Sequence, residues 1–224
     1  MPCLVAHRGQ KFSLPENTLE SVKRAIDCGA LAVEFDVQMT ADHVPVICHD
    51  AGLLRTGGVD IIIADVDYAD LKNISVGEPD RFADKYQSVT LPALQTMVAM
   101  LQKAPQVKVF VGLKNESIHA FGINNFLQPV ISQIQAIRQH CVIIADELEI
   151  LLALKRQSAV PAGWILHRWD EHDFTLAKHS NVDYLVMNQK YYHAELEHDF
   201  AGDSWDWVIY ELHDADEALA LFDQ

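Results

Sequence analysis

The stretch that decides the fold is AVEFDVQMTADHVPVICHD, residues 32–50. Apolar residues alternate with Glu34 and Asp36 in its first half, which predicts a β-strand that turns both carboxylates to one face. Only a few polar residues separate this strand from the run VPVIC, too few for a helical crossover. We therefore expect an antiparallel hairpin over 34–49, which would bring His49 near Asp36.

Outside this hairpin, short apolar runs alternate with amphipathic segments, a rhythm that favours a parallel sheet with crossover helices. The first helix should lie in NTLESVKRAIDCG, with Pro15 near its start and Gly29 as its stop, and a last helix in DADEALALF. Residues 50–90 hold glycines and prolines among polar residues and indicate an irregular insertion, with a short helix near YADLKNI. The expected sheet strands lie near residues 3–7, 31–37, 107–113, 141–145, 163–167, 183–188 and 207–212.

Length and composition favour one globular domain over residues 1–224, since a single α/β barrel commonly takes this length. Half of the residues are hydrophobic, which is enough for a sizeable core. The formal charge of −15 argues against a nucleic-acid partner, because no basic patch could dominate such a field. A small anionic substrate is still allowed, because one local cation outweighs a diffuse negative surface at close range.

The four cysteines are widely spaced and form no ligand pattern, and a chain of this length needs no disulfide. We therefore expect reduced cysteines and a cytoplasmic location. The start MPCLVAHRGQ reaches charged residues too soon for a signal peptide or a membrane span, so we expect no integral membrane segment. Oligomeric state is left open.

Ionisable side chains stand at or beside the ends of the runs VAHRG, VEFDV, VICHD and GLKNE. Strand ends are where parallel α/β folds build their sites. Glu34 and Asp36 lie about 6.6 Å apart along a strand, so their oxygens can converge on a hard divalent cation that would offset their repulsion. The alternative is an ordinary surface strand whose acids form salt bridges with Arg8 and Lys114.

The pair His7 and His49 can supply a general acid and a general base near neutral pH. Arg8 and Lys114 suit a phosphate group. His167 ends another expected strand, where we favour a structural role over a place in the pocket. The remaining histidines fit polar helix faces and turns.

These residues resemble the glycerophosphodiester phosphodiesterase family. AHRG, PENT, GALAVEFDVQMTADHVPVICHD and LLRT are similar to its N-terminal signature over residues 6–56, and LPALQTMVAML, VFVGLK and WVIYELHDADEALAL to later elements. The resemblance implies a TIM-type (β/α) barrel that uses Mg²⁺ or Ca²⁺ to hydrolyse glycerophosphodiesters to glycerol 3-phosphate and an alcohol. The roles that it implies are metal ligands for Glu34 and Asp36, an acid/base pair for His7 and His49, and phosphate binding for Arg8 and Lys114.

Two departures from the family pattern stand out. The family's third metal-binding glutamate stands two residues before the lysine, where this chain has Gly112. Water can occupy such a position around Mg²⁺ or Ca²⁺, so we expect cation binding with lower affinity. Glu116 shares strand parity with Gly112, but four strand residues span roughly 13 Å, so it could substitute only if the chain turned back.

The second departure is the missing last barrel strand, because the chain stops at EALALFDQ. An open barrel would expose a strand edge with unpaired backbone groups. Three alternatives follow: the first and seventh strands pair directly, a partner chain closes the barrel, or the chain is a truncated product.

Two function classes remain. The first is a metal-dependent phosphodiesterase acting on a small glycerophosphodiester, with Gly112 in place of a metal-binding glutamate as the feature that would impair it. A lyase that stops at the cyclic phosphate is a related enzyme. The second is a degenerate, non-catalytic barrel that binds a phosphorylated ligand or a protein partner, which Gly112 and the missing strand motivate. The chemical coherence of two histidines with two phosphate-binding cations favours catalysis. The alcohol group and the preferred cation are left open.

Overall fold

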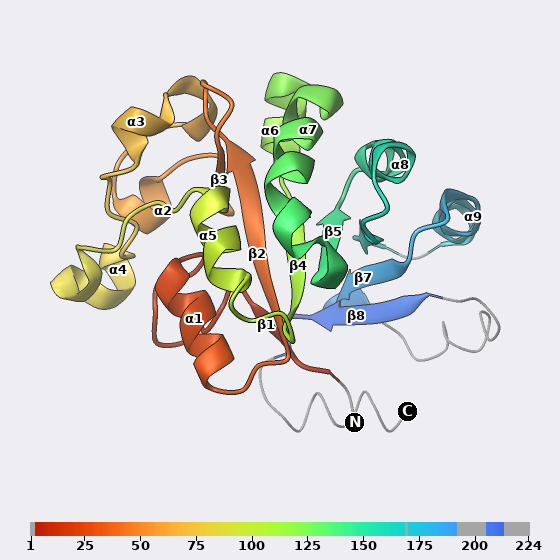
Figure 1. The fold of residues 1–224 in the computed structure, drawn as a ribbon, viewed down its shortest axis with the longest axis horizontal. Coiled ribbons are helices and arrows are strands. Elements are labelled where there is room, and N and C mark those ends of the chain that lie inside the picture. Colours follow the sequence, from red (N-terminus) through yellow and green to blue (C-terminus); the bar gives the residue numbers. More distant parts are fainter. Residues whose placement is uncertain (1–2, 169, 192–204, 213–224) are drawn as a thin grey trace.

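The computed structural model describes residues 3–168, 170–191 and 205–212 (Figure 1). Its strands are β1 (Val5–His7), β2 (Ala32–Met39), β3 (Pro45–Ile47), β4 (Lys108–Leu113), β5 (Cys141–Ala145), β6 (Ala162–Leu166), β7 (Tyr184–Asn188) and β8 (Asp206–Tyr210). Seven of them run parallel in the order β1-β2-β4-β5-β6-β7-β8, and β3 pairs with β2 in antiparallel fashion. The seven expected strands are confirmed, each within two residues at its ends.

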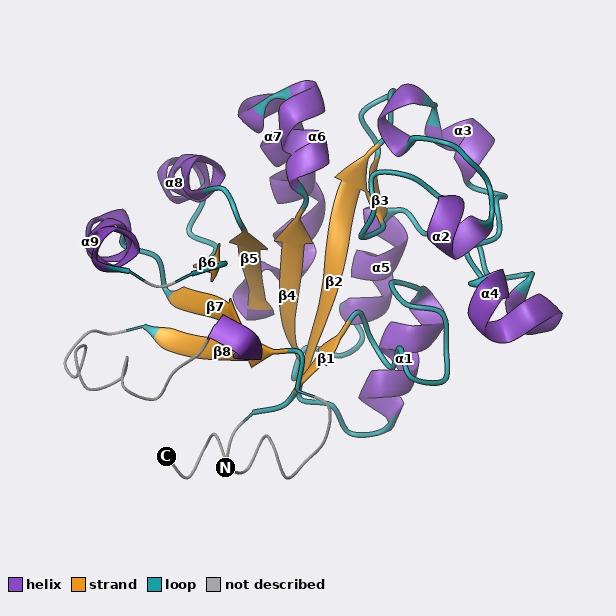
Figure 2. Ribbon diagram, turned by 180° about the vertical axis from the view of Figure 1, so that it is seen from behind, coloured by secondary structure: helices purple, strands orange, loops and turns teal. Residues whose placement is uncertain are grey.

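Helices follow the strands on the outside of the curved sheet (Figures 1 and 2). These outer helices are α1 (Leu19–Asp27), α5 (Leu94–Leu101), α6 (Asn115–Phe121), α7 (Ile123–Ile134), α8 (Leu148–Gln157) and α9 (Glu171–Ser180). Short 3-10 turns lie at η3 (Gln135–His140) and η4 (Gln189–Tyr191). The result is a nearly closed parallel barrel of the TIM type, as the sequence predicted. The segment 214–222, expected as the last helix, lies outside the described residues.

Strand alternation divides the core into two layers. Val33, Phe35 and Val37 of β2 belong to the large cluster between the sheet and its helices. The opposite parity supplies a smaller inner cluster that includes Ala32 and Phe110. Glu34 and Asp36 share the parity of this inner layer, so the sequence pattern places two carboxylates on the inner face of a strand whose residues are all buried.

The predicted hairpin is present. Val37 pairs with Ile47, and the N–H of Cys48 donates to the carbonyl of Asp36 at 3.0 Å. This pairing brings the segment that carries His49 beside the carboxylates of β2.

Residues 50–90 form the expected insertion, in which short helices surround a separate apolar cluster beyond β3 (Figure 1). Its elements are α2 (Leu54–Gly57), η1 (Ile63–Asp65), α3 (Tyr68–Leu71), α4 (Pro79–Phe82) and η2 (Ala83–Tyr86). The short helix expected near YADLKNI is α3.

The barrel has a seam between its first and last parallel strands. Among the described residues, β8 pairs with β7 and no strand ladder joins it to β1, so direct pairing of these strands is not the closure seen. Side chains meet there instead, because the rings of His7 and Tyr210 contact edge to face with centroids 5.9 Å apart.

Helix α1 begins later than its sequence suggests. Pro15 was expected near its start, but PENT is a loop and the helix begins at Leu19, after Thr18. Thr18 Oγ1 accepts from the N–H of Ser21 at 3.1 Å, and Ser21 Oγ accepts from the N–H of Thr18 at 3.2 Å, which makes a capping box.

Thr18→Ala should lower the free energy of unfolding by about 1 kcal/mol, because alanine cannot accept the hydrogen bond from Ser21. Urea denaturation measures this loss. An unchanged unfolding midpoint would show that the cap contributes nothing to stability.

The four cysteines are free thiols in the structure and differ in burial. Cys3 and Cys28 are exposed, whereas Cys48 and Cys141 are buried. Burial raises the pKa of each buried thiol to about 12.

Iodoacetamide should therefore label Cys3 and Cys28 in the folded protein and all the cysteines after denaturation, as measured by mass spectrometry. Rapid labelling of Cys141 in the native state would contradict its burial.

Among the described residues, no helix has both the length and the apolar character needed to cross a membrane.

Candidate active site

The two carboxylates of β2 are the centre of the candidate site. Glu34 is 7% exposed and Asp36 is 6% exposed. Burial, followed by the charge of Asp36, raises the pKa of Glu34 above its ordinary value. Because two buried like charges repel, this pair needs protons, cationic side chains or a metal ion beside it.

The end of β1 lies against Glu34. His7 is in register with Glu34, and its Nε2 is 3.8 Å from Glu34 Oε2. The N–H of Arg8, a residue with a positive φ of 57°, donates to the same oxygen at 3.0 Å. Burial, with the nearby charges of Arg8 and Lys11, lowers the pKa of His7 to about 4. The ring of His7 is therefore neutral at neutral pH.

Asp36 is contacted by both predicted phosphate-binding residues. Arg8 Nε lies 3.2 Å from Asp36 Oδ2, and Lys114 Nζ lies 3.6 Å from Asp36 Oδ1. Asn17 also holds this residue, since its Nδ2 donates to Oδ2 at 2.9 Å and its Oδ1 accepts from the N–H of Asp36 at 3.1 Å. The salt bridges of the alternative interpretation are thus present, but they lie on a buried strand rather than on a surface strand.

Gly112 faces the two carboxylates. It is in register with Asp36, and a Cβ placed on it would lie 3.2 Å from both Asp36 Oδ1 and Glu34 Oε1. The two oxygens therefore line the space that a side chain at position 112 would enter. Carboxylate oxygens are the donors that Mg²⁺ and Ca²⁺ prefer, and water completes their coordination readily, so the residues present fit a divalent cation.

Glu116 does not join these carboxylates. It lies in the first turn of α6, is exposed, and its Oε2 accepts from Gln38 Nε2 at 3.3 Å. Within the described residues, no group of three or more His, Cys, Asp or Glu side chains is arranged to hold a metal ion.

His49 follows β3 and reaches the site through charged neighbours. Its Nδ1 lies 2.7 Å from Asp50 Oδ1, and Asp50 is bound by Arg55. Arg55 in turn contacts Glu16, which binds Arg8. A small cavity beside this network is lined in part by Asn17 and His49. The six predicted site residues therefore lie in one connected set of contacts.

Several polar residues of the site were not predicted from the sequence. Asn17, Glu16 and Arg55 lie in the quoted segments PENT and LLRT, which were the available signal. Glu211 adds a carboxylate from the end of β8, with Oε1 3.6 Å from His7 Nδ1. His167, for which a structural role was favoured, is largely exposed and contacts Asp146.

Comparison with known proteins shows the family to which the chain is similar. The family described as the glycerophosphoryl diester phosphodiesterase family matches residues 7–194. A glycerophosphodiester phosphodiesterase of Bacillus altitudinis is 30% identical over 135 residues, which are 60% of this chain and 54% of that protein. Glycerophosphodiester phosphodiesterase 1 of Bos taurus is 24% identical over 164 residues, which are 73% of this chain and 48% of that protein. The chain spans about half the length of these relatives.

Solved structures share the fold. An Oleispira antarctica phosphodiesterase in complex with its product sn-glycerol-3-phosphate has a TM-score of 0.87 at 22% identity and covers 100% of this chain and 90% of its own. A glycerophosphodiester phosphodiesterase from Thermotoga maritima has a TM-score of 0.73 at 19% identity, over 99% of this chain and 91% of its own. With its match over residues 7–194, the chain belongs to the glycerophosphoryl diester phosphodiesterase family.

Proposed function

We propose that this protein hydrolyses glycerophosphodiesters to glycerol 3-phosphate and an alcohol with the help of a divalent cation. The observation that carries the proposal is the set of contacts on β2, where His7, Arg8 and Lys114 meet the buried carboxylates Glu34 and Asp36. The relative with bound sn-glycerol-3-phosphate supports this substrate class. The free thiols support a cytoplasmic location.

Glu34 and Asp36 would hold Mg²⁺ or Ca²⁺. A bound cation would stabilise negative charge on the phosphoryl oxygens. It would also take over the neutralisation of Asp36, which leaves Arg8 and Lys114 available to bind phosphate. Because position 112 supplies no carboxylate, we expect a weaker cation affinity than a site with three carboxylates would have.

The two histidines would exchange protons with the attacking and leaving oxygens. His7 is neutral at neutral pH, so it has a ring nitrogen that can accept a proton. His49 Nδ1 faces an Asp50 carboxylate, which directs its Nε2 away from that partner. Histidine is the side chain that most often carries out such proton transfer.

Release of glycerol 3-phosphate from glycerophosphocholine tests this function. The protein is incubated with Mg²⁺ or Ca²⁺ over a concentration series, beside a sample treated with EDTA. We expect release that saturates with the cation and stops after chelation. Folded protein without turnover at any cation concentration would refute the proposal. Phosphorus NMR of the product separates hydrolysis from a lyase reaction that ends at the cyclic phosphate.

A non-catalytic barrel that binds a phosphorylated ligand or a protein partner is the second candidate. Gly112 favours it, because the position facing the carboxylates supplies no ligand. This candidate gains if Gly112→Glu has phosphodiesterase activity that the natural chain lacks, and it fails if the natural chain turns over well.

A further inference from the structure

A chain of charged hydrogen bonds connects His49 with Arg8. His49 Nδ1 lies 2.7 Å from Asp50 Oδ1, and Arg55 donates to both oxygens of Asp50, from Nε at 2.7 Å and from Nη2 at 3.0 Å. The same Nη2 of Arg55 donates to Glu16 Oε1 at 2.7 Å. Arg8 Nη1 donates to that Glu16 oxygen at 3.0 Å. The network therefore joins a proposed proton carrier to a proposed phosphate-binding group.

The first link fixes the protonated nitrogen of His49. Burial alone would raise the pKa of Asp50, but its hydrogen bonds with Arg55 and His49 outweigh burial and lower that pKa to about 2. Asp50 is therefore ionised and can only accept hydrogen bonds. Nδ1 of His49 must carry the hydrogen, which leaves Nε2 as the atom that accepts a proton in the neutral ring.

The second link fixes the two guanidinium groups relative to each other. Glu16 is 8% exposed, and one of its oxygens accepts from both Arg8 and Arg55. Burial would raise the pKa of Glu16, but the hydrogen bond from Arg55 and the charge of Arg8 hold it below its ordinary value. The backbone of Glu16 is held as well, since its N–H donates to Glu78 Oε1 at 2.5 Å.

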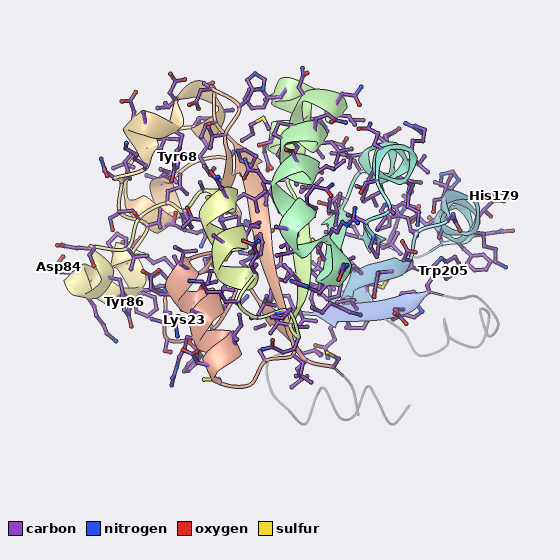
Figure 3. All side chains as sticks on the ribbon, viewed as in Figure 1. Lys23, Tyr68, Asp84, Tyr86, His179 and Trp205 are labelled. Atoms are coloured by element: carbon purple, nitrogen blue, oxygen red, sulfur yellow. The ribbon has the colours of Figure 1, made fainter. Side chains whose placement is uncertain are left out.

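Other hydrogen bonds already connect the insertion with the loop after β1, so this connection alone does not require the network. Arg81 Nη2 donates to the carbonyl of Lys11 at 2.6 Å, and the hydroxyl of Tyr86, labelled in Figure 3, donates to the carbonyl of Ser13 at 2.8 Å. These bonds join the same two segments without passing through His49 or Arg8.

We propose that Asp50, Arg55 and Glu16 are positioning residues that hold the His49 ring and the Arg8 guanidinium in one mutual arrangement. The proposal rests on the proposed function, because it gives His49 the proton exchange and Arg8 the phosphate. Asp50 should act on kcat through His49, and Glu16 should act on KM through Arg8. Arg55 contacts both Asp50 and Glu16, so it should act on both kcat and KM.

Steady-state kinetics of the full chain with glycerophosphocholine and a saturating cation test the division of roles. Asp50→Asn should lower kcat about 10- to 100-fold with little change in KM. This is the range typical for loss of a residue that orients a functional side chain through a hydrogen bond, as known from metal sites. Glu16→Gln should raise KM about 10-fold with a smaller effect on kcat. A merely structural network would instead leave kcat and KM of the folded protein unchanged while the unfolding midpoint falls.

Matched controls come from helix α1. Asp27→Asn removes a carboxylate that pairs with Lys23 on the exposed face of the helix, at 2.5 Å (Figure 3). Glu20→Gln makes the same chemical change as Glu16→Gln at an exposed position. Both controls should keep the kcat and KM of the natural chain.

The ¹⁵N NMR signals of the His49 ring give a readout that does not need turnover, with His49→Gln used to assign them. We expect the hydrogen on Nδ1 in the natural chain. In Asp50→Asn this hydrogen should move toward Nε2. An asparagine side chain has one acceptor oxygen where aspartate has two, so it cannot accept hydrogen bonds from both His49 and Arg55 as the carboxylate does. An unchanged tautomer would overturn the positioning role of Asp50.

The outcomes separate the two proposals. If the natural chain has no turnover, the proposed function fails, and the tautomer of His49 in Asp50→Asn still decides the positioning role. If Asp50→Asn does not fold, Arg55→Lys replaces it, because an ammonium group keeps the charge but not the planar fork. Arg55→Lys should show intermediate changes in both kcat and KM. Natural values in the folded variant would overturn the proposal.

Discussion

His49→Gln should lower kcat by about 10²- to 10⁴-fold, the contribution typical of a positioned general acid or base. Glutamine keeps a polar side chain of similar reach but cannot exchange a proton near neutral pH. His7→Gln should have an effect of the same order, because His7 is the other member of the proposed acid/base pair and contacts Glu34. Initial rates of glycerol 3-phosphate release measure both effects, with cation and substrate at saturation.

His172→Gln is the matched control, because His172 is exposed on α9 and contacts none of the site residues described above. It should keep the kcat of the natural chain. Thermal unfolding of each variant shows whether the protein is still folded. If folded His49→Gln retains its kcat, His49 is not a proton carrier, and the acid/base roles must lie elsewhere.

The fold was largely predictable because its signal is repeated along the chain. The alternation of Val33, Phe35 and Val37 with two acids predicted a strand with one polar face, and the structure confirms this division of layers. The start of α1 was less well predicted. Proline is a common first residue of helices, so Pro15 suggested the start of α1. The capping box of Thr18 instead places the start at Leu19.

The site was predictable as a set of residues but not as a set of bonds. The ends of parallel strands converge, so the sequence could bring His7, Glu34 and Lys114 together. It could not pair Glu16 with Arg55, because these loop residues have no periodicity and their meeting depends on how the insertion folds back. The pairing of Arg8 and Lys114 with Asp36 was foreseen only as the alternative to a cation site.

How the barrel closes at its seam could not be predicted from the sequence either. Strand patterns predicted β1 and β8 but carried no information on whether their edges reach each other. The described residues show a contact between His7 and Tyr210 where a strand ladder was one expectation. The ring of Tyr210, the last residue of β8, therefore lies beside a proposed catalytic histidine.

Gly112→Glu should make stability depend strongly on divalent cations. A third carboxylate would enter the space lined by Glu34 Oε1 and Asp36 Oδ1, and both oxygens would have to shift slightly to admit its Cβ at 3.2 Å. Without a cation, like charges about 4 Å apart repel by about 4 kcal/mol at an effective dielectric constant of 20. Protonation of one carboxyl group relieves part of this repulsion, so we expect a net loss of about 2 kcal/mol in EDTA.

Gly112→Gln is the matched control, because it has the same length and the same contact with the two oxygens but no charge. The steric effect is therefore common to both variants, and the difference between them reports the carboxylate alone. A cation that binds only the folded state adds about 2.7 kcal/mol to the free energy of unfolding when its free concentration is 100 times its Kd. Urea denaturation in EDTA and in a Mg²⁺ or Ca²⁺ series should show Gly112→Glu less stable than Gly112→Gln without cation and more strongly stabilised by it. Equal cation responses in the two variants would mean that the space before Gly112 is not a cation site, and Glu34 and Asp36 would then owe their burial to Arg8, Lys114 and protonation alone.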